Sequence, residues 1–343
     1  MNKFNNAIVI GAGAFGTSIA SILSHNFKQV YLKVRSQDVY DSLINNKNEI
    51  YLPGLTLPSN LIPILSWDDL KDSNKDNVEL IVSGLPTAGI HSFFSDNFDY
   101  IDYFIKKDIP LVSLSKGIDP NTLDLPDDLF FNLWPSYKES FIFLSGPSFA
   151  KEIVEKQITM VTVAGRSKSN LKNLCKMMNT DYFKLLNSYD VKGVLLGGAL
   201  KNVVAIAGGI VEGLGFNHNT RAALITRAIA EMLKYGKVYN ARPETFYGLA
   251  GMGDLILTTT GGLSRNKQFG LEIAKGRKPK EIIESQRSVV EGYKTTLAAH
   301  LVSEKYGIKT RIFESVYQVL YHDLVVSDAI DSIMKIPSSF EIE

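Results

Sequence analysis

Two lysines of this chain have neighbours that suggest acid–base chemistry. Lys201 lies in the segment Gly197-Gly-Ala-Leu-Lys-Asn202, and residues 197, 198, 201, 205 and 208 share one helical face, which reads Gly, Gly, Lys, Ala, Gly. Because glycine in a helix costs about 0.5–1 kcal/mol, this face indicates that either a ligand or a second helix approaches the backbone closely. Lys116 follows an apolar strand-like run, at a position where open α/β sheets bind ligands. A buried lysine can serve as proton donor or acceptor, and none of the five histidines lies in a comparable cluster.

A glycine-rich turn near the start of the chain predicts a phosphate-binding loop. The segment Gly11-Ala-Gly-Ala-Phe-Gly16 follows the apolar run Ala7–Ile10 and opens a helical pattern. Gly11 permits the tight turn, Gly13 lets the backbone approach a pyrophosphate, and Gly16 lets the helix pack on the sheet. This arrangement is typical of a dinucleotide cofactor site, and a turn without a ligand is the alternative.

The end of the second predicted strand bears on which dinucleotide is bound. It reads Val34-Arg35-Ser36, with arginine where an acidic residue would accept a hydrogen bond from the ribose 2′-hydroxyl of NAD. An arginine there can pair with a 2′-phosphate instead. The sequence therefore favours NADP(H), with NAD(H) possible, unless Arg35 is simply a solvent-exposed residue at a strand end.

A third cluster could bind a small phosphorylated substrate. The segment Gly248–Asp254 is followed by Ser264-Arg-Asn266, where Ser264 is suited to cap a helix. The N–H groups of that helix start, with Arg265 beside them, would form a phosphate site. An ordinary capped surface helix is the alternative.

The elements that would hold these residues predict two domains. Short β-like runs alternate with helical patterns in the first half, which predicts parallel βαβ units. The expected strands are 7–10, 30–34, 80–83, 111–114, 141–144 and 160–164, and segments 51–54 and 57–60 are expected to be loops. From about residue 190 helical patterns take over, at 191–213, 221–235, 267–275, 293–306 and 312–321. We therefore expect a Rossmann-type α/β domain with a mainly parallel sheet at 1–189 and an all-α domain at 190–343.

Composition narrows the class of protein. The 343 residues suggest about two domains, and 37 basic against 36 acidic residues give a net charge of +1, so no nucleic-acid partner is expected. The single cysteine cannot form an intramolecular disulfide or a cysteine-based zinc site, so no metal is expected. The apolar stretch 193–211 carries Lys201 and Asn202 at its centre, which favours a buried helix over membrane insertion. These features predict a cytoplasmic protein.

Taken together, the motifs resemble those of the bacterial-type NAD(P)-dependent glycerol-3-phosphate dehydrogenases. The resemblance runs over nearly the whole chain, through Gly11–Gly16, Ser115-Lys-Gly117, Ser145-Gly-Pro-Ser-Phe-Ala150, Gly197–Asn202, Gly248–Asp254, Ser264–Asn266 and Val289-Val-Glu-Gly292. It implies a homodimer that interconverts dihydroxyacetone phosphate and sn-glycerol 3-phosphate for phospholipid synthesis.

The resemblance also implies residue roles. Lys201 matches the proton donor and acceptor, and Lys116 matches a lysine that touches both cofactor and substrate. The other implied substrate-binding residues are Gly146, Ser148, Asp254, Ser264, Arg265 and Asn266. The implied cofactor contacts, beyond the glycines of the loop, are Ala14, Phe15, Arg35, Ala150, Arg265, Val289 and Glu291.

Three positions depart from the family pattern. Leu195 stands where the family usually has glutamate, Ile158 stands where a Pro-Thr usually begins, and Asn217-His218 replace a more glycine-rich turn. Two other functions therefore remain open at this point. One is a related two-domain dehydrogenase for another hydroxy acid or an acyl thioester, and the other is a degenerate dehydrogenase that senses NADP(H).

Overall fold

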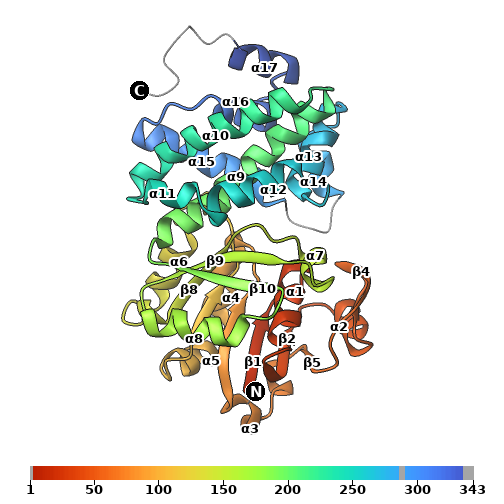
Figure 1. Ribbon diagram of the computed structural model, residues 1–343, viewed down its shortest axis with the longest axis vertical. Helices are drawn as coiled ribbons and strands as arrows, with labels where there is room; N and C mark the ends of the chain where they lie inside the picture. The colour runs from red at the N-terminus through yellow and green to blue at the C-terminus, as the bar shows by residue number, and fades with distance from the viewer. Residues whose placement is uncertain (1–2, 286–289, 335–343) are drawn as a thin grey trace. The chain divides into compact units, whose positions relative to one another are not determined.

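The computed structural model describes residues 3–285 and 290–334, with side chains described up to residue 330. They form two compact units, coloured along the chain in Figure 1. Unit 1 comprises the residues up to 116 together with 125–195, and unit 2 comprises 117–124 together with the chain from 196 onward. The predicted domain ranges 1–189 and 190–343 stay a prediction.

Unit 1 is built on a sheet. Within the described residues this sheet has eight strands in the order β10-β9-β8-β7-β6-β1-β2-β5, and β3 and β4 form a separate antiparallel pair. All neighbours in the large sheet are parallel except β8 and β9. The strands are β1 (Phe4–Ile10), β2 (Phe27–Lys33), β3 (Lys47–Asn48), β4 (Leu52–Thr56), β5 (Leu61–Ile64), β6 (Val78–Ser83), β7 (Leu111–Ser113), β8 (Phe141–Ser145), β9 (Thr159–Gly165) and β10 (Phe183–Ser188).

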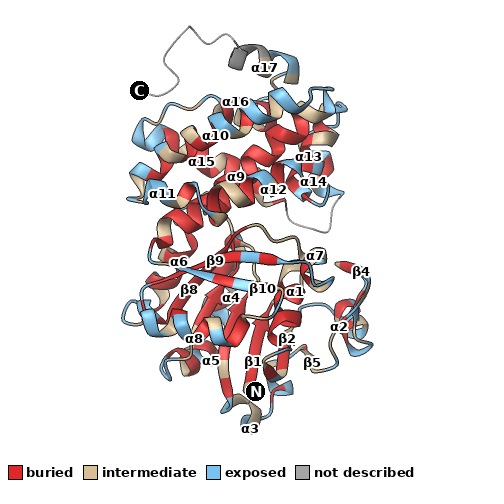
Figure 2. Cartoon of the chain, in the orientation of Figure 1, coloured by how far each residue is buried: buried red, intermediate tan, exposed pale blue. Residues whose placement is uncertain are grey.

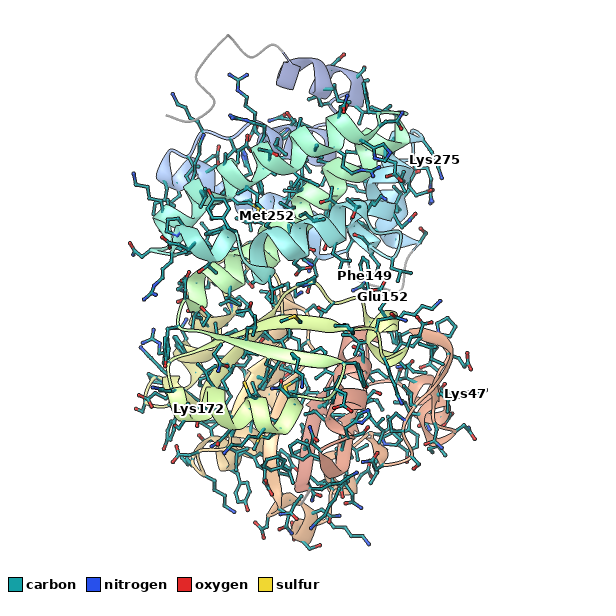
Figure 3. The ribbon with its side chains drawn as sticks, in the orientation of Figure 1. Lys47, Phe149, Glu152, Lys172, Met252 and Lys275 are labelled. Atoms are coloured by element: carbon teal, nitrogen blue, oxygen red, sulfur yellow. The ribbon has the colours of Figure 1, made fainter. Side chains whose placement is uncertain are left out.

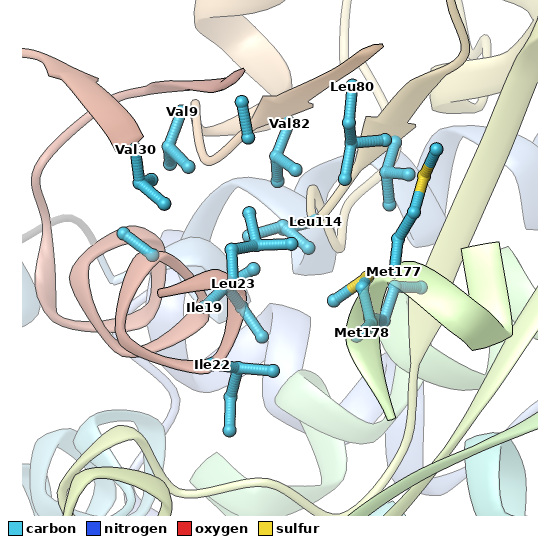
Figure 4. Packing of buried hydrophobic residues seen from close by; sticks show 14 of the residues in the cluster. Val9, Ile19, Ile22, Leu23, Val30, Leu80, Val82, Leu114, Met177 and Met178 are labelled. Carbon is cyan, nitrogen blue, oxygen red and sulfur yellow. The ribbon is translucent and has the colours of Figure 1, made fainter. Parts of the chain in front are cut away.

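Helices supply the apolar side chains that cover this sheet. On one face, α1 and α8 pack Ile19, Ile22 and Met178 against strand residues such as Val9 and Val82 (Figure 4). In Figure 2, β8 is buried throughout, whereas α8 has both buried and exposed residues. The helices of unit 1 are α1 (Ala14–Leu23), α2 (Gln37–Ile44), α3 (Asp72–Lys75), α4 (Ile90–Asp96), α5 (Phe98–Ile105), α6 (Pro126–Leu133), α7 (Ala150–Val154) and α8 (Lys168–Met178).

The secondary structure in the described part of unit 2 is helical, and the segment 117–124 is a loop. Its central helix is α9 (Val191–Gly213), whose first residues belong to unit 1. By length and composition α9 could cross a membrane, but its apolar stretch is buried inside the protein along its full length, as the lysine and asparagine at its centre predict. The other elements are α10 (His218–Val238), α11 (Pro243–Phe246), a π-helical segment (Leu249–Gly253), α12 (Asp254–Thr260), α13 (Arg265–Ala274), α14 (Pro279–Glu284), α15 (Glu291–Tyr306), α16 (Ile312–Tyr321) and α17 (Val326–Met334).

The predicted fold class is confirmed, with corrections at β4 and at the two edge strands of the large sheet. The segment 51–54 is not a loop throughout, because Leu52 opens β4, which pairs with β3 in a short antiparallel ladder. Strand β5 was not among the predicted strands. It contains Pro63, which cannot donate a ladder hydrogen bond and is tolerated because β5 is an edge strand. Strand β10, at the other edge, was also not predicted.

Candidate active site

The glycine-rich turn lies where the sheet topology reverses. The chain runs from β1 to β2 and β5 on one side, then returns to β6 on the other side of β1, so the carboxyl ends of β1 and β6 form the switch point at which open sheets bind ligands. Gly11 has φ of +99°, which favours glycine. A Cβ on Gly16 would collide with the Gly11 carbonyl oxygen, whereas a Cβ on Gly13 would meet no atom within 4 Å. Glycine is therefore required at position 11 by backbone conformation and at position 16 by packing, and the space over Gly13 is open for a pyrophosphate.

The start of α1 is suited to an anion. Gly13 is the N-cap of α1 and offers no side chain to the first-turn N–H groups, which need acceptors from outside the helix. Buried Asn48 stabilises the turn: its side-chain amide donates to the Ala12 carbonyl oxygen at 3.0 Å and to Thr17 Oγ1 at 2.8 Å. Asn48 was not among the predicted site residues, because its role depends on a contact across 36 positions of the chain.

Several predicted cofactor and substrate residues lie at the same carboxyl edge of the sheet in unit 1. Arg35 is exposed and follows β2, whose Lys33 is paired with Ile10 just before the glycine turn. Lys116 Nζ lies 5.5 Å from the Phe15 ring centroid and donates to the Gly146 carbonyl oxygen at 3.3 Å.

The segment after β8 brings further predicted residues to this group. The Ser148 hydroxyl also donates to the Gly146 carbonyl oxygen, at 2.8 Å. Ala150 opens α7, which packs on α1; its neighbours Phe149 and Glu152 are labelled in Figure 3. The structure therefore groups Lys116 with Phe15, Gly146 and Ser148.

A buried polar cluster surrounds Lys201 in unit 2. The lysine side chain is 8% exposed and forms an ion pair with Asp254, whose side chain is 1% exposed. Lys201 Nζ also donates to Thr258 Oγ1 at 2.9 Å, and the Thr258 hydroxyl lies 3.2 Å from the same Asp254 oxygen. Asp254 and Thr258 are four residues apart on α12 and so project from one face of that helix. The cluster holds the Lys201 ammonium group in a fixed place between α9 and α12.

The glycines beside Lys201 have a packing role. A Cβ on Gly197 would lie 2.5 Å from the Ala250 carbonyl oxygen, and one on Gly208 would lie 2.5 Å from Thr259 Cγ2. Of the two explanations that the sequence left open, close approach of a neighbouring helix therefore accounts for these two positions. The same close approach places Lys201, which lies between them on that face, against α12.

The third predicted cluster lies at the start of α13. Ser264 caps the helix as predicted, accepting from the Lys267 N–H at 3.2 Å, and Arg265 is exposed beside it. Asn266 is buried; it donates to Asn202 Oδ1 at 2.9 Å and accepts from the Gly292 N–H at 3.0 Å. These bonds connect the residue next to Lys201 with the first turn of α15.

The remaining predicted residues are placed as follows. Glu291 opens α15, next to the glycine that contacts Asn266. Val289 lies outside the described residues. Thr258 was not predicted as a site residue; its signal is the four-residue spacing from Asp254, which has meaning only once 254–260 is known to be a helix.

Comparison with known proteins gives a consistent result over the whole chain. Residues 6–171 match the family model described as NAD-dependent glycerol-3-phosphate dehydrogenase N-terminus, and residues 190–331 match the model described as its C-terminus. A protein of Syntrophotalea carbinolica named glycerol-3-phosphate dehydrogenase (NAD(P)+) is 39% identical over 332 residues, which cover 96% of this chain and 97% of that protein. A protein of Leptospira biflexa with the same name is 39% identical over 328 residues, covering 95% and 96% of the two chains.

A solved structure agrees with this result. The crystal structure of glycerol-3-phosphate dehydrogenase from Coxiella burnetii is similar with a TM-score of 0.87 at 28% sequence identity, covering 98% of this chain and 100% of that one. The resemblance seen in the motifs is thus confirmed by family models, by full-length relatives and by fold. This chain belongs to the NAD-dependent glycerol-3-phosphate dehydrogenase family.

Proposed function

We propose that this chain interconverts dihydroxyacetone phosphate and sn-glycerol 3-phosphate, with Lys201 as the proton donor in reduction and the proton acceptor in oxidation. The observation that carries the proposal is the buried cluster of Lys201, Asp254 and Thr258. Its ammonium group is held by a carboxylate and a hydroxyl, and can give a proton to the oxygen of a ketone as that carbon becomes an alcohol. The names of the full-length relatives support glycerol 3-phosphate as one member of this pair.

The other residues have supporting roles in this proposal. The turn Gly11–Gly16 and the first turn of α1 would hold the cofactor pyrophosphate, and Arg35 would pair with a 2′-phosphate. When bound, a nicotinamide cofactor supplies or accepts the hydride. Ser264, Arg265 and the first-turn N–H groups of α13 would hold the substrate phosphate.

Three further properties are part of the proposal. Preference for NADPH is supported by arginine rather than an acidic residue after β2. The family resemblance supports a homodimer. The sequence has a single cysteine, which supports a cytoplasmic location.

The first measurement is NADPH oxidation by the purified protein with dihydroxyacetone phosphate. The Lys201→Arg variant keeps a cation beside Asp254, so the buried carboxylate is not left unpaired, but a guanidinium does not give up its proton. We expect kcat to fall by about 10²–10⁴-fold, while NADPH binding, followed by cofactor fluorescence, stays unchanged.

A matched lysine-to-arginine change serves as control. Lys237 is exposed on α10, and Lys237→Arg should leave turnover unchanged. Full turnover in Lys201→Arg would remove this lysine from the mechanism. No turnover in the unmodified protein, with NADPH still bound, would contradict the proposed reaction and favour a sensor of NADP(H), with Leu195 as the first residue to test.

A further inference from the structure

Charged residues outside the predicted site connect the first turn of α13 to the neighbouring helices. Lys267 is 4% exposed, and its Nζ donates to the Thr260 carbonyl oxygen at 2.9 Å, at the end of α12. The same Nζ lies 3.0 Å from Glu212 Oε2, on α9. That carboxylate oxygen also accepts from Arg221 Nη2 of α10 at 2.6 Å. One network of Lys267, Glu212 and Arg221 therefore ties four helices together.

The main chain of Lys267 is held as firmly as its side chain. Its N–H donates to the Ser264 hydroxyl, which closes the first turn of α13. Its carbonyl oxygen packs so tightly on Gly209 of α9 that a Cβ there would collide with it. Because Lys267 follows Arg265 and Asn266 directly, fixing it at both places also fixes the turn that presents those two residues.

The network also carries a charge that suits an anion. Lys267 and Arg221 are two cations against the single carboxylate of Glu212, which leaves one positive charge in excess. Water screens the charge of Lys267 weakly because this lysine is buried, whereas the side chains of Arg221 and Glu212 are 21% and 33% exposed. The excess charge adds to the partial positive charge of the α13 N-terminus, which already favours an anion.

We propose that Lys267, Glu212 and Arg221 are positioning residues for recognition of the substrate phosphate at the start of α13. The network fixes the positions of Arg265 and of the first-turn N–H groups of α13. It also adds positive potential at the start of that helix, without touching the substrate. The inference rests on the proposed function and adds to it three residues that neither the motifs nor the family resemblance singled out.

The test compares three variants in steady-state kinetics and in binding. Lys267→Met removes the charge and keeps most of the side-chain volume, whereas Lys267→Arg keeps the charge. Lys275→Met is the matched control, since Lys275 forms an ion pair with Glu272 at 2.7 Å at the far end of the same helix (Figure 3) and its side chain is 64% exposed. Binding of sn-glycerol 3-phosphate is measured by isothermal titration calorimetry in parallel.

We expect Lys267→Met to raise KM for dihydroxyacetone phosphate by about tenfold, because the start of α13 loses a nearby positive charge and a contact that positions Arg265. The Kd for sn-glycerol 3-phosphate should rise by a similar factor, while KM for NADPH and kcat stay unchanged. Lys267→Arg should restore both values, and Lys275→Met should not alter them. A purely structural role would instead change KM for NADPH, kcat and Tm together, and Lys267→Arg would not correct them selectively.

The outcomes separate this inference from the proposed function. An active protein whose folded Lys267→Met variant has normal KM and Kd for the phosphorylated ligands would overturn the network alone. An unmodified protein that neither turns over dihydroxyacetone phosphate nor binds sn-glycerol 3-phosphate would overturn both proposals. If Lys267→Met does not fold, Arg221→Gln, at a side chain that is 21% exposed, replaces it with the same expected direction.

Discussion

At the scale of single residues, three polar side chains in unit 2 carry most of the proposed chemistry. Lys201 and Asp254 were predicted site residues, and the structure brings them into contact through α9 and α12. Thr258 completes the cluster with a hydroxyl that accepts from the lysine and lies within hydrogen-bonding distance of the aspartate. By accepting from Lys201 Nζ, the Thr258 hydroxyl restricts the orientation of the ammonium group.

Removing that hydroxyl should slow the reaction without weakening substrate binding. Thr258→Val keeps the side-chain shape but leaves Lys201 one acceptor short, at a cost of about 1.5 kcal/mol or more for a bond to a charged group. We expect kcat for reduction of dihydroxyacetone phosphate to fall by about tenfold, with KM unchanged. Thr226→Val, at an exposed threonine of α10, is the control. Equal kcat values for the two variants would show that Thr258 is only a packing residue.

Cofactor choice is also decided at single residues in this proposal. Arg35→Asp replaces a partner for a 2′-phosphate with a group that repels it and that can accept from a 2′-hydroxyl. The ratio of kcat/KM for NADPH to that for NADH should fall by about tenfold or more. Lys28→Asp makes the same charge change at the opposite end of the same strand and should leave the ratio unaltered. An unaltered ratio in Arg35→Asp would contradict the assignment of this arginine.

At the scale of elements, the helix α9 shows how glycine serves packing beside a site. Gly197, Gly208 and Gly209 each meet another helix so closely that a methyl group has no room. Glycine lowers helix propensity, so the helix gives up local stability to let the neighbouring backbones approach. The approach is what places Asp254 and Thr258 beside Lys201.

A methyl group at Gly209 should therefore destabilise unit 2. In Gly209→Ala the new Cβ would collide with the Lys267 carbonyl oxygen and lie 2.9 Å from the Leu271 nitrogen. Overpacking of this kind costs about 1–3 kcal/mol, which outweighs the gain of about 1 kcal/mol in helix propensity. We expect a lower Tm in calorimetry. Gly262→Ala, where a Cβ would meet nothing within 4 Å, is the control, and a Tm for Gly209→Ala at or above that of Gly262→Ala would refute the packing role.

At the scale of the whole molecule, the order of the strands decides where a cofactor could bind. The strand order reverses between β1 and β6, which places the glycine turn at the switch point. The sheet continues through the antiparallel pair β8 and β9 on the side of β6. Neither feature can be read from the local pattern of a strand, because both depend on which strands become neighbours.

The proposed homodimer is tested at this scale. A chain of 38.0 kDa should sediment with twice that mass over a broad range of protein concentrations. Sedimentation equilibrium, run with and without NADPH, gives the mass directly. A single species of 38.0 kDa under both conditions would contradict the proposed dimer.

The sequence by itself determined the features that depend on residues close together along the chain. The glycine turn after β1, the bounds of α9 and α16 and the cap at Ser264 follow from backbone freedom, apolar spacing and local hydrogen bonds. Family resemblance added the roles of Lys201 and Asp254 and the order of the motifs. These are properties that a segment expresses largely without its neighbours in space.

Only the tertiary structure decided which distant residues meet. The proximity of Thr258 to Lys201, the support of the glycine turn by Asn48, and the network of Lys267 with Glu212 and Arg221 all join segments that are separated in the sequence. The edge strands β5 and β10 likewise became visible only through their pairing. The physical reason is that such contacts depend on helix packing and strand order, which the spacing of residues along one segment does not encode.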